Sequence, residues 1–210
     1  MSVLSGSGRD DRFCHFGHSF LPCARMVFGE GREMMNRMRS LMGAALACVA
    51  IAANATGLRA VSPPQQAPAL VLQDLGGQRH DLAELRGQVV LVNFWASWCR
   101  PCLAEMPSIQ RLSERLRGRP FRVLAVDVGE GRATVWRFVR LLGLEFPVLL
   151  DEEGERARAW GVKVYPGSFL IDTSGRIRWR ARGALEWDQA EVVRRVEELL
   201  AAEGRPQRLN

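Results

Sequence analysis

The chain has 210 residues, of which 47% are apolar and 25% charged, with 20 glycines and 10 prolines. This composition is typical of a globular protein and excludes the collagen-like, coiled-coil and wholly disordered classes. The formal net charge is +6, but the basic residues are scattered and form no basic stripe, so nucleic-acid binding is not expected.

The beginning of the chain differs in pattern from the rest. Residues 1–33 are polar and of mixed charge, and we interpret them as disordered or as lying upstream of the true start. Residues 34–55 carry two arginines and then an alanine-rich apolar run, the pattern of an export signal, with cleavage expected after Ala55. An uncleaved membrane anchor is the alternative. Residues 56–67 are rich in proline and glutamine and are expected to form an extended linker.

A single domain is expected over residues 68–204, followed by a tail at 205–210. A small hairpin is predicted over 69–82. The next segment, Val89–Trp95, is a nearly continuous apolar run rich in β-branched residues, which predicts a strand buried on both faces of a sheet. Residues 101–117 carry apolar side chains at steps of three and four and therefore predict a helix.

The rest of the domain alternates between strands and helices, and Pro107 is expected to kink the helix that contains it. Strands are predicted at 121–128, 146–150, 168–172 and 176–180, and helices at 133–142, 155–160 and 187–202. This order indicates an α/β fold with a central mixed β-sheet flanked by helices and an N-terminal hairpin extension.

Cysteine is the informative residue type. The five cysteines are too few for a disulfide framework, and only Cys99 and Cys102 lie close together. If residues 1–55 are removed, this pair holds the only cysteines of a protein in a compartment where disulfides form readily. A zinc site is not expected, because zinc would need a second pair and the domain's sole histidine, His80, precedes the motif. A structural disulfide is the remaining alternative, but a C-x-x-C between strand and helix favours a redox pair.

The spacing indicates different roles for the two sulfurs. Cys99 falls between the strand and the helix, where unpaired backbone N–H groups and the helix dipole favour the thiolate form that attacks disulfides. Cys102 lies one turn deeper on the same helix face and can attack the mixed disulfide that Cys99 forms with a substrate. We therefore expect Cys99 to be the nucleophile and Cys102 the resolving thiol.

The segment Trp98-Cys-Arg-Pro-Cys102, set after the apolar strand and followed by Leu103–Pro107, resembles the thioredoxin superfamily. The resemblance is to its exported TlpA/ResA/CcmG-like branch, with a redoxin or AhpC/TSA-like domain, and covers about residues 68–203. It extends to several later segments. These are Phe146–Asp151, Trp160–Val162, Phe169–Asp172 with Gly175–Ile177, and Gly183–Trp187.

The resemblance implies a substrate-binding surface and a thioredoxin-like fold. Pro166 corresponds to the cis-proline whose loop packs beside the active-site cysteines and pairs with a substrate strand. Tyr165, just before it, and Trp98 are expected to contact the substrate. The loop Val164–Ser168 departs from the commoner small or threonine-containing loop of this branch. A trans turn proline at position 166 is the alternative.

The resemblance also implies a proton acceptor. Cytosolic thioredoxins carry a buried aspartate at the position of Asn93, and asparagine cannot accept the proton of the resolving thiol. The exported branch has a glutamate three residues after the second cysteine, which here is Glu105. A carboxylate near a buried thiol has its pKa raised by desolvation and can serve as the acceptor. The alternative is a solvated helix glutamate. Four tryptophans are interpreted as packing residues: Trp136, Trp160, Trp179 and Trp187.

These implications predict an exported protein-disulfide reductase that needs no organic cofactor. Its expected clients are apocytochrome c or copper-site thiols, and its expected electron donor is a membrane thiol carrier. We expect a monomer in the periplasm or another extracytoplasmic compartment. A disulfide oxidase or isomerase is the main alternative. A thiol peroxidase is disfavoured by Ala96, where peroxidases carry threonine, and a copper carrier by the lack of a histidine after His80.

Overall fold

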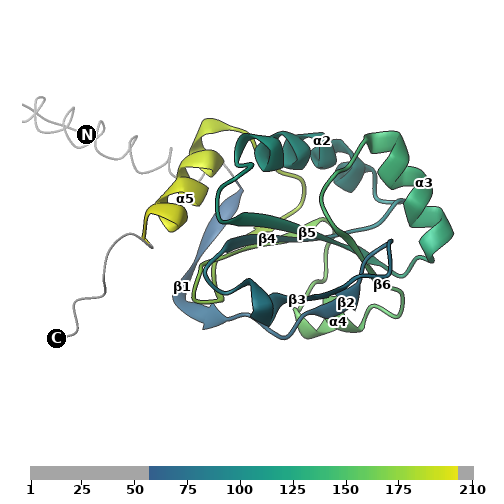
Figure 1. The fold of residues 1–210 in the computed structure, drawn as a ribbon, viewed down its shortest axis with the longest axis horizontal. Helices are drawn as coiled ribbons and strands as arrows, with labels where there is room; N and C mark the ends of the chain where they lie inside the picture. Colours follow the sequence, from purple (N-terminus) through teal and green to yellow (C-terminus); the bar gives the residue numbers. More distant parts are fainter. Residues whose placement is uncertain (1–56, 203–210) are drawn as a thin grey trace, which may run out of the picture. The chain divides into compact units, whose positions relative to one another are not determined.

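The computed structural model describes residues 57–202, whose fold is drawn in Figure 1. The predictions for residues 1–33, 34–55 and 205–210 lie outside the described part of the chain. The strands are β1 (Leu58–Gln66), β2 (Val71–Gln73), β3 (Arg79–Asp81), β4 (Val89–Trp95), β5 (Phe121–Val128), β6 (Val148–Asp151), β7 (Gly167–Ile171) and β8 (Arg176–Arg182). The helices are the 3₁₀ helix η1 (Leu82–Leu85) and the α-helices α2 (Arg100–Arg115), α3 (Arg132–Leu142), α4 (Glu155–Ala159) and α5 (Ala190–Ala201).

The main sheet is mixed, with the strand order β1-β8-β7-β4-β5-β6. Strands β4, β5 and β6 run parallel to one another, and β7 pairs with β4 in the antiparallel sense. Strand β4 lies between β5 and β7, and all seven of its residues are buried, which confirms the prediction of a strand covered on both faces. The one polar side chain in this strand is that of Asn93.

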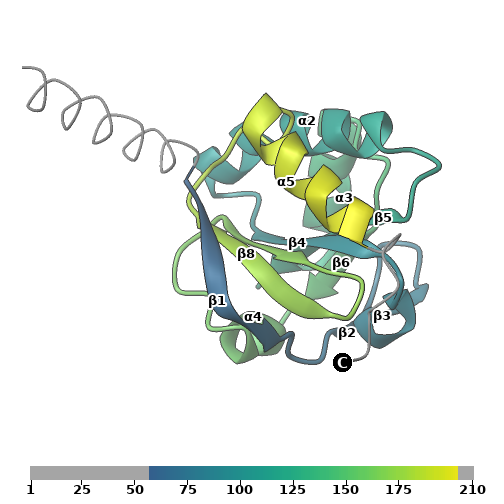
Figure 2. The same cartoon turned by 90° about the vertical axis from the view of Figure 1, so that its left-hand side faces the viewer.

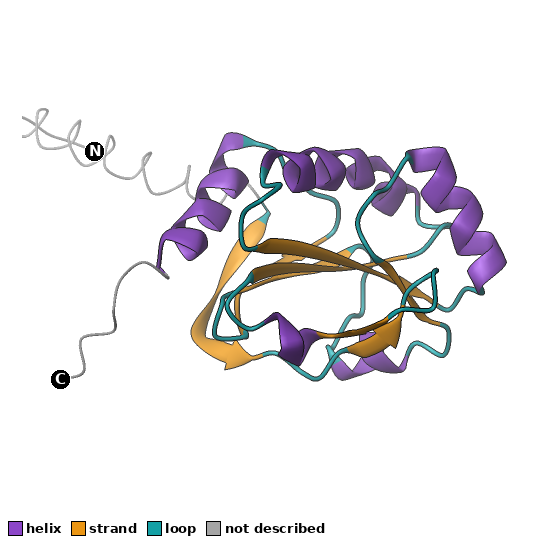
Figure 3. Cartoon of the chain, viewed as in Figure 1, coloured by secondary structure: helices purple, strands orange, loops and turns teal. Residues whose placement is uncertain are grey.

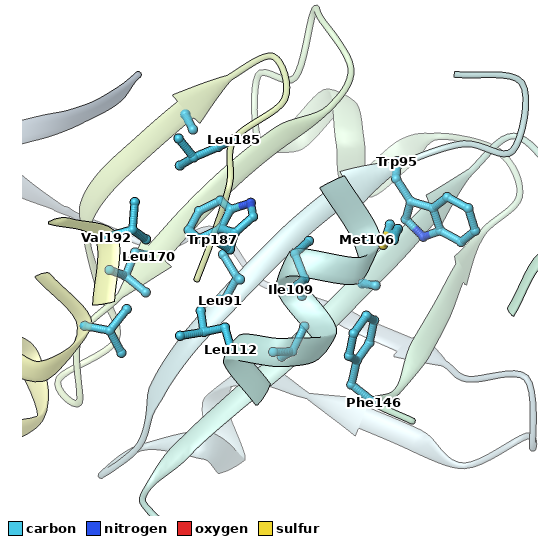
Figure 4. Close-up of a cluster of buried hydrophobic side chains, with 14 of the residues drawn as sticks. Leu91, Trp95, Met106, Ile109, Leu112, Phe146, Leu170, Leu185, Trp187 and Val192 are labelled. Atoms are coloured by element: carbon cyan, nitrogen blue, oxygen red, sulfur yellow. The ribbon is translucent and has the colours of Figure 1, made fainter. Parts of the chain in front are cut away.

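Helices cover both faces of the sheet and enclose two cores. Helices α2, α3 and α5 lie on one face, while α4, η1 and the β2–β3 hairpin lie on the other (Figure 1). Figure 3 shows the same layers by element type. In the first core, Leu91 and Trp95 of β4 pack with Met106 and Ile109 of α2 and with Trp187 (Figure 4). The predicted α/β fold with a mixed sheet flanked by helices is confirmed.

The prediction of a linker at residues 56–67 is wrong. Residues 58–66 form β1, which pairs with β8 at the edge of the main sheet, and the two strands lie side by side in Figure 2. Leu58 and Val61 bury their side chains in the two cores. Two prolines are tolerated because β1 is an edge strand with an irregular register between Ala60 and Gln65, where no ladder hydrogen bond is lost. The folded domain therefore includes this strand.

Two helices differ in detail from their predictions. Helix α2 runs through Pro107 without interruption from Arg100 to Arg115. Helix α5 begins at Ala190, three residues later than predicted, and in the preceding segment the backbone N–H of Trp187 donates to the Ser108 hydroxyl across the domain (3.0 Å). Within residues 57–202, none of the helices combines the length and apolar character needed to cross a membrane.

Candidate active site

The two cysteines lie where β4 leads into α2. Cys99 is the N-cap residue of α2, and its sulfur accepts a hydrogen bond from the backbone N–H of Cys102 (3.3 Å). The two sulfurs form a disulfide, so the structure shows the oxidised pair. Cys102 is completely buried, whereas Cys99 keeps 6% of its surface exposed. The outer sulfur is therefore the one at the positive end of the helix dipole, where a thiolate is favoured.

An aromatic surface borders the disulfide. Trp98 precedes Cys99 and is 66% exposed, and its ring meets that of Tyr165 edge to face with centroids 5.8 Å apart. The bond between Tyr165 and Pro166 is a cis peptide. The next residue, Gly167, pairs with Phe94 near the end of β4, which brings the loop to the cysteines. The three residues assigned to the substrate surface thus lie together at one end of the sheet.

Glu105 lies one helical turn beyond Cys102 and is 1% exposed, so the alternative of a solvated helix glutamate is wrong. Three groups donate hydrogen bonds to its carboxylate. They are the side-chain amide of Asn93 (2.6 Å), the backbone N–H of Leu185 (3.0 Å) and the indole N–H of Trp187 (3.3 Å). The side chain is therefore held by donors from β4 and from the segment before α5, one helical turn beyond Cys102.

The pKa of Glu105 is raised from an ordinary value of 4.5 to about 7. Burial is the largest cause, because the charged carboxylate loses its hydration. The hydrogen bonds from Leu185, Asn93 and Trp187 lower the pKa but do not offset the burial. A group with this pKa gains and loses a proton readily near neutral pH, which is what a general base for a buried thiol requires.

Comparison with known proteins establishes the family. The model of the AhpC/TSA family matches residues 63–180, more than half of the chain. The chain belongs to the AhpC/TSA family. Among curated proteins, it is 40% identical to the thiol-disulfide oxidoreductase ResA of Geobacillus thermodenitrificans over 119 residues, covering 57% of this chain and 68% of that protein. It is 35% identical to ResA of Bacillus subtilis over 121 residues, covering 58% and 68%.

Solved structures agree with this membership. A thioredoxin family thiol:disulfide interchange protein from Chlorobium tepidum is 28% identical, with a TM-score of 0.59 over 67% of this chain and 99% of that one. A thioredoxin from Neisseria meningitidis is 32% identical, with a TM-score of 0.60 over 67% and 93%. This AhpC/TSA family protein is thus a ResA/CcmG-like member of the thioredoxin superfamily and a thiol–disulfide oxidoreductase.

Sequence reasoning missed part of the site of this AhpC/TSA family member. Trp187 was assigned to packing, but its indole N–H also donates to Glu105. Asn93 orders the site, since its amide donates both to Glu105 and to the Ser168 hydroxyl (2.9 Å). A polar residue inside a fully apolar strand was the available signal for Asn93. For Trp187, the pattern offered no signal of a polar contact.

Two carboxyl groups near the loop that leads to the cysteines were also missed. Asp127 lies near the end of β5, in register with Trp95 of β4, and its side chain is fully buried. Glu130 lies in the turn after β5 and accepts hydrogen bonds from Ser97, two residues before Cys99. An acidic residue within a predicted buried strand was the only signal for this pair.

Proposed function

We propose that this protein is an extracytoplasmic protein-disulfide reductase that transfers two electrons from its Cys99/Cys102 dithiol to client disulfides. The arrangement that supports the proposal is an outer sulfur at a helix N-terminus, a buried second sulfur, and Glu105 held one turn beyond it. The cysteine pair carries the electrons itself, so no organic cofactor takes part.

In the first step, the Cys99 thiolate attacks one sulfur of a client disulfide. A Cys99–client S–S bond forms as the client S–S bond breaks, and the leaving client sulfur departs as a thiolate that takes a proton from water. The helix N-terminus stabilises the Cys99 thiolate beforehand. This step does not involve Glu105.

In the second step, the thiol proton of Cys102 passes to the Glu105 carboxylate. The resulting Cys102 thiolate attacks the Cys99 sulfur, the Cys99–client bond breaks, and the second client sulfur leaves as a thiolate and is protonated. The client has gained two electrons and two protons, and the protein ends with the disulfide seen in the structure. Because burial raises its pKa to about 7, Glu105 can accept this proton near neutral pH.

The exposed face around the pair fits a protein client. Trp98 and Val164 are 66% and 54% exposed, and Tyr165 lies against Trp98. An extended client segment would contact these apolar side chains while its sulfur reaches Cys99. The clients that the resemblance implies are the haem-site thiols of apocytochrome c or copper-site thiols, and the implied donor that reduces the pair again is a membrane thiol carrier.

The export signal predicted from the sequence at residues 34–55 supports the proposed compartment, where a reductase would need such a donor because the surroundings are oxidising. Sequencing the N-terminus of the protein recovered from an extracytoplasmic fraction tests this. A chain that begins at Thr56 supports cleavage after Ala55, a longer chain held in the membrane supports the anchor, and recovery from the cytoplasm alone contradicts the proposal.

Single-cysteine variants test the two roles. The reduced Cys102→Ser variant should accumulate a mixed disulfide with a disulfide-bonded CxxCH peptide, because nothing then attacks the Cys99–client bond. The matched Cys99→Ser variant should accumulate none, since Cys102 is buried. Non-reducing gels and mass spectrometry measure the adduct. Trapping by Cys99→Ser in place of Cys102→Ser would contradict the assignment.

A further inference from the structure

The loop before Cys99 is held by the side-chain carboxylate of Glu130, which lies in the connection between β5 and α3. The backbone N–H of Ser97 donates to one oxygen of Glu130 (2.5 Å), and the Ser97 hydroxyl donates to the other (2.6 Å). Both oxygens of one carboxylate thus bind one residue, and both bonds are short, as expected when the acceptor is charged. Because Ser97 lies two residues before Cys99, this clamp fixes the approach of the chain to the reactive sulfur.

The turn after β5 is built to present Glu130. Gly129 has a φ of 81°, a left-handed conformation that favours glycine, and its N–H donates to the Asp151 carbonyl at the end of β6 (3.1 Å). Gly131 is the N-cap of α3. Glu130 therefore projects from a turn anchored on both sides, and the Ser97 clamp ties the β4–α2 loop to the β5–α3 loop.

Asp127 is a buried carboxyl group on the strand that leads to Glu130. Its side chain is completely buried, and neither of its oxygens receives a hydrogen bond from residues 57–202. A buried carboxylate without donors is costly, so the neutral acid is the stable form. Burial, followed by the charge and the hydrogen-bonding contact of Glu130, raises the pKa of Asp127 to about 8. A neutral acid has an O–H to donate, and the Glu130 carboxyl group is the neighbour that raises the pKa of Asp127 most after burial.

We propose that Glu130 and Asp127 are positioning residues for the Cys99 nucleophile. Glu130 binds Ser97 through both carboxylate oxygens, and Ser97 lies in the loop that sets Cys99 at the N-terminus of α2. The donation from neutral Asp127 to Glu130 is the inferred part of this arrangement. The Cys99 N–H donates to the Ala96 carbonyl within the same loop (3.1 Å), so a shift of Ser97 is passed on to the sulfur. This inference rests on the proposed role of Cys99 as the attacking thiol.

The pH dependence of Cys99 alkylation tests the proposal. In the reduced full-length chain, the rate of iodoacetamide addition is followed from pH 4 to 9 by mass spectrometry of the Cys99 peptide. Glu130→Gln keeps the size but replaces the carboxylate by an amide with one acceptor oxygen, which weakens the hold on Ser97 and so the placement of Cys99 at the helix dipole. We expect its alkylation midpoint to rise by about one pH unit and its disulfide exchange at pH 7 to slow about tenfold.

Conservative variants separate positioning from general damage to the fold. Asp127→Asn keeps a donor towards Glu130 and should behave like the wild type, whereas Asp127→Val keeps the size, loses the donor and should behave like Glu130→Gln. The matched control is Glu152→Gln, since Glu152 is an exposed glutamate in the turn after β6 and should leave the midpoint unchanged. If Glu130→Gln does not fold, Ser97→Ala, which removes one of the two bonds, should slow exchange about threefold.

Each alternative outcome has a distinct meaning. If Glu130→Gln matches Glu152→Gln, the clamp does not position Cys99 and the inference is wrong. If the midpoint falls, Glu130 acts by repelling the thiolate, which also overturns positioning. If the wild type itself titrates no lower than a free cysteine, at about 8.5, the proposed role of Cys99 as an activated thiolate fails instead.

Discussion

The side chain that distinguishes this site is that of Glu105, because its environment sets its proton affinity. The carboxyl group is almost fully buried, and the donors that it finds within residues 57–202 are all neutral. Neutral hydrogen bonds stabilise a carboxylate less than a salt bridge does, so burial prevails and the pKa rises to about 7. The result is a base whose pKa lies near neutral pH, as proton transfer from the buried Cys102 thiol requires.

The raised pKa of Glu105 predicts a pH-dependent stability. The folded protein binds this proton more tightly than the unfolded chain, so the stabilisation is complete below pH 4.5 and is lost as the pH rises to about 7. The difference corresponds to about 3 kcal/mol. Urea unfolding of the oxidised wild-type protein at pH 5 and pH 8 should show a fall in the free energy of unfolding, and this fall should be about 2.5 kcal/mol smaller in Glu105→Gln. Equal falls in both proteins would contradict the raised pKa.

The same substitution predicts a kinetic effect limited to one step. Glu105→Gln cannot take the Cys102 proton, so release of the client from the mixed disulfide at pH 7 should slow about 100-fold, while attack by Cys99 keeps its rate. Single-turnover reduction of a disulfide-bonded peptide, quenched with acid, separates the two steps. An equal loss in both steps would mean that Glu105 supports the structure of the site and not proton transfer.

At the scale of elements, the site is assembled at one end of the sheet. The carboxyl ends of β4 and β5, the beginning of β7 and the segment before α5 all deliver side chains to it. Local patterns were sufficient to predict β4 and α2, because apolar periodicity records which faces are buried. They could not predict that Leu185 would donate to Glu105, since that contact joins residues 80 positions apart.

Strand β1 is the element that sequence patterns missed. Proline and exposed polar residues give it no strand signal, and its pairing depends on β8, more than 100 residues later. A chain that starts at Pro68 should therefore be less stable than one that starts at Gly57 by about 3–6 kcal/mol, the value of burying the Leu58 and Val61 side chains. Urea unfolding of both chains measures the difference. Equal stabilities would show that β1 contributes nothing to the fold.

At the scale of the whole molecule, the order of strands and helices was enough to predict an α/β fold with a mixed sheet, and the spacing of the motif was enough to predict roles for Cys99 and Cys102. The expectation that this fold is thioredoxin-like came from the resemblance. The resemblance added Glu105, Tyr165 and Pro166, and the structure brings these residues to the same end of the sheet. Sequence patterns could not predict the hydrogen-bond partners of an individual carboxyl group, because these come from segments that meet only in the folded chain. The direction of electron transfer likewise depends on the protein as a whole, because the same cysteine pair can donate electrons as a dithiol or accept them as a disulfide.

The equilibrium reduction potential of the Cys99/Cys102 pair tests the central claim most directly. Residues 56–210 would be equilibrated with glutathione or dithiothreitol buffers, and the oxidised fraction measured by alkylation and mass spectrometry. A reductase requires a value near or below about −220 mV, more reducing than protein disulfide isomerase at about −180 mV, and this is the result we predict. A value near about −120 mV, that of a strong periplasmic oxidant, would contradict the account and make the protein a disulfide donor.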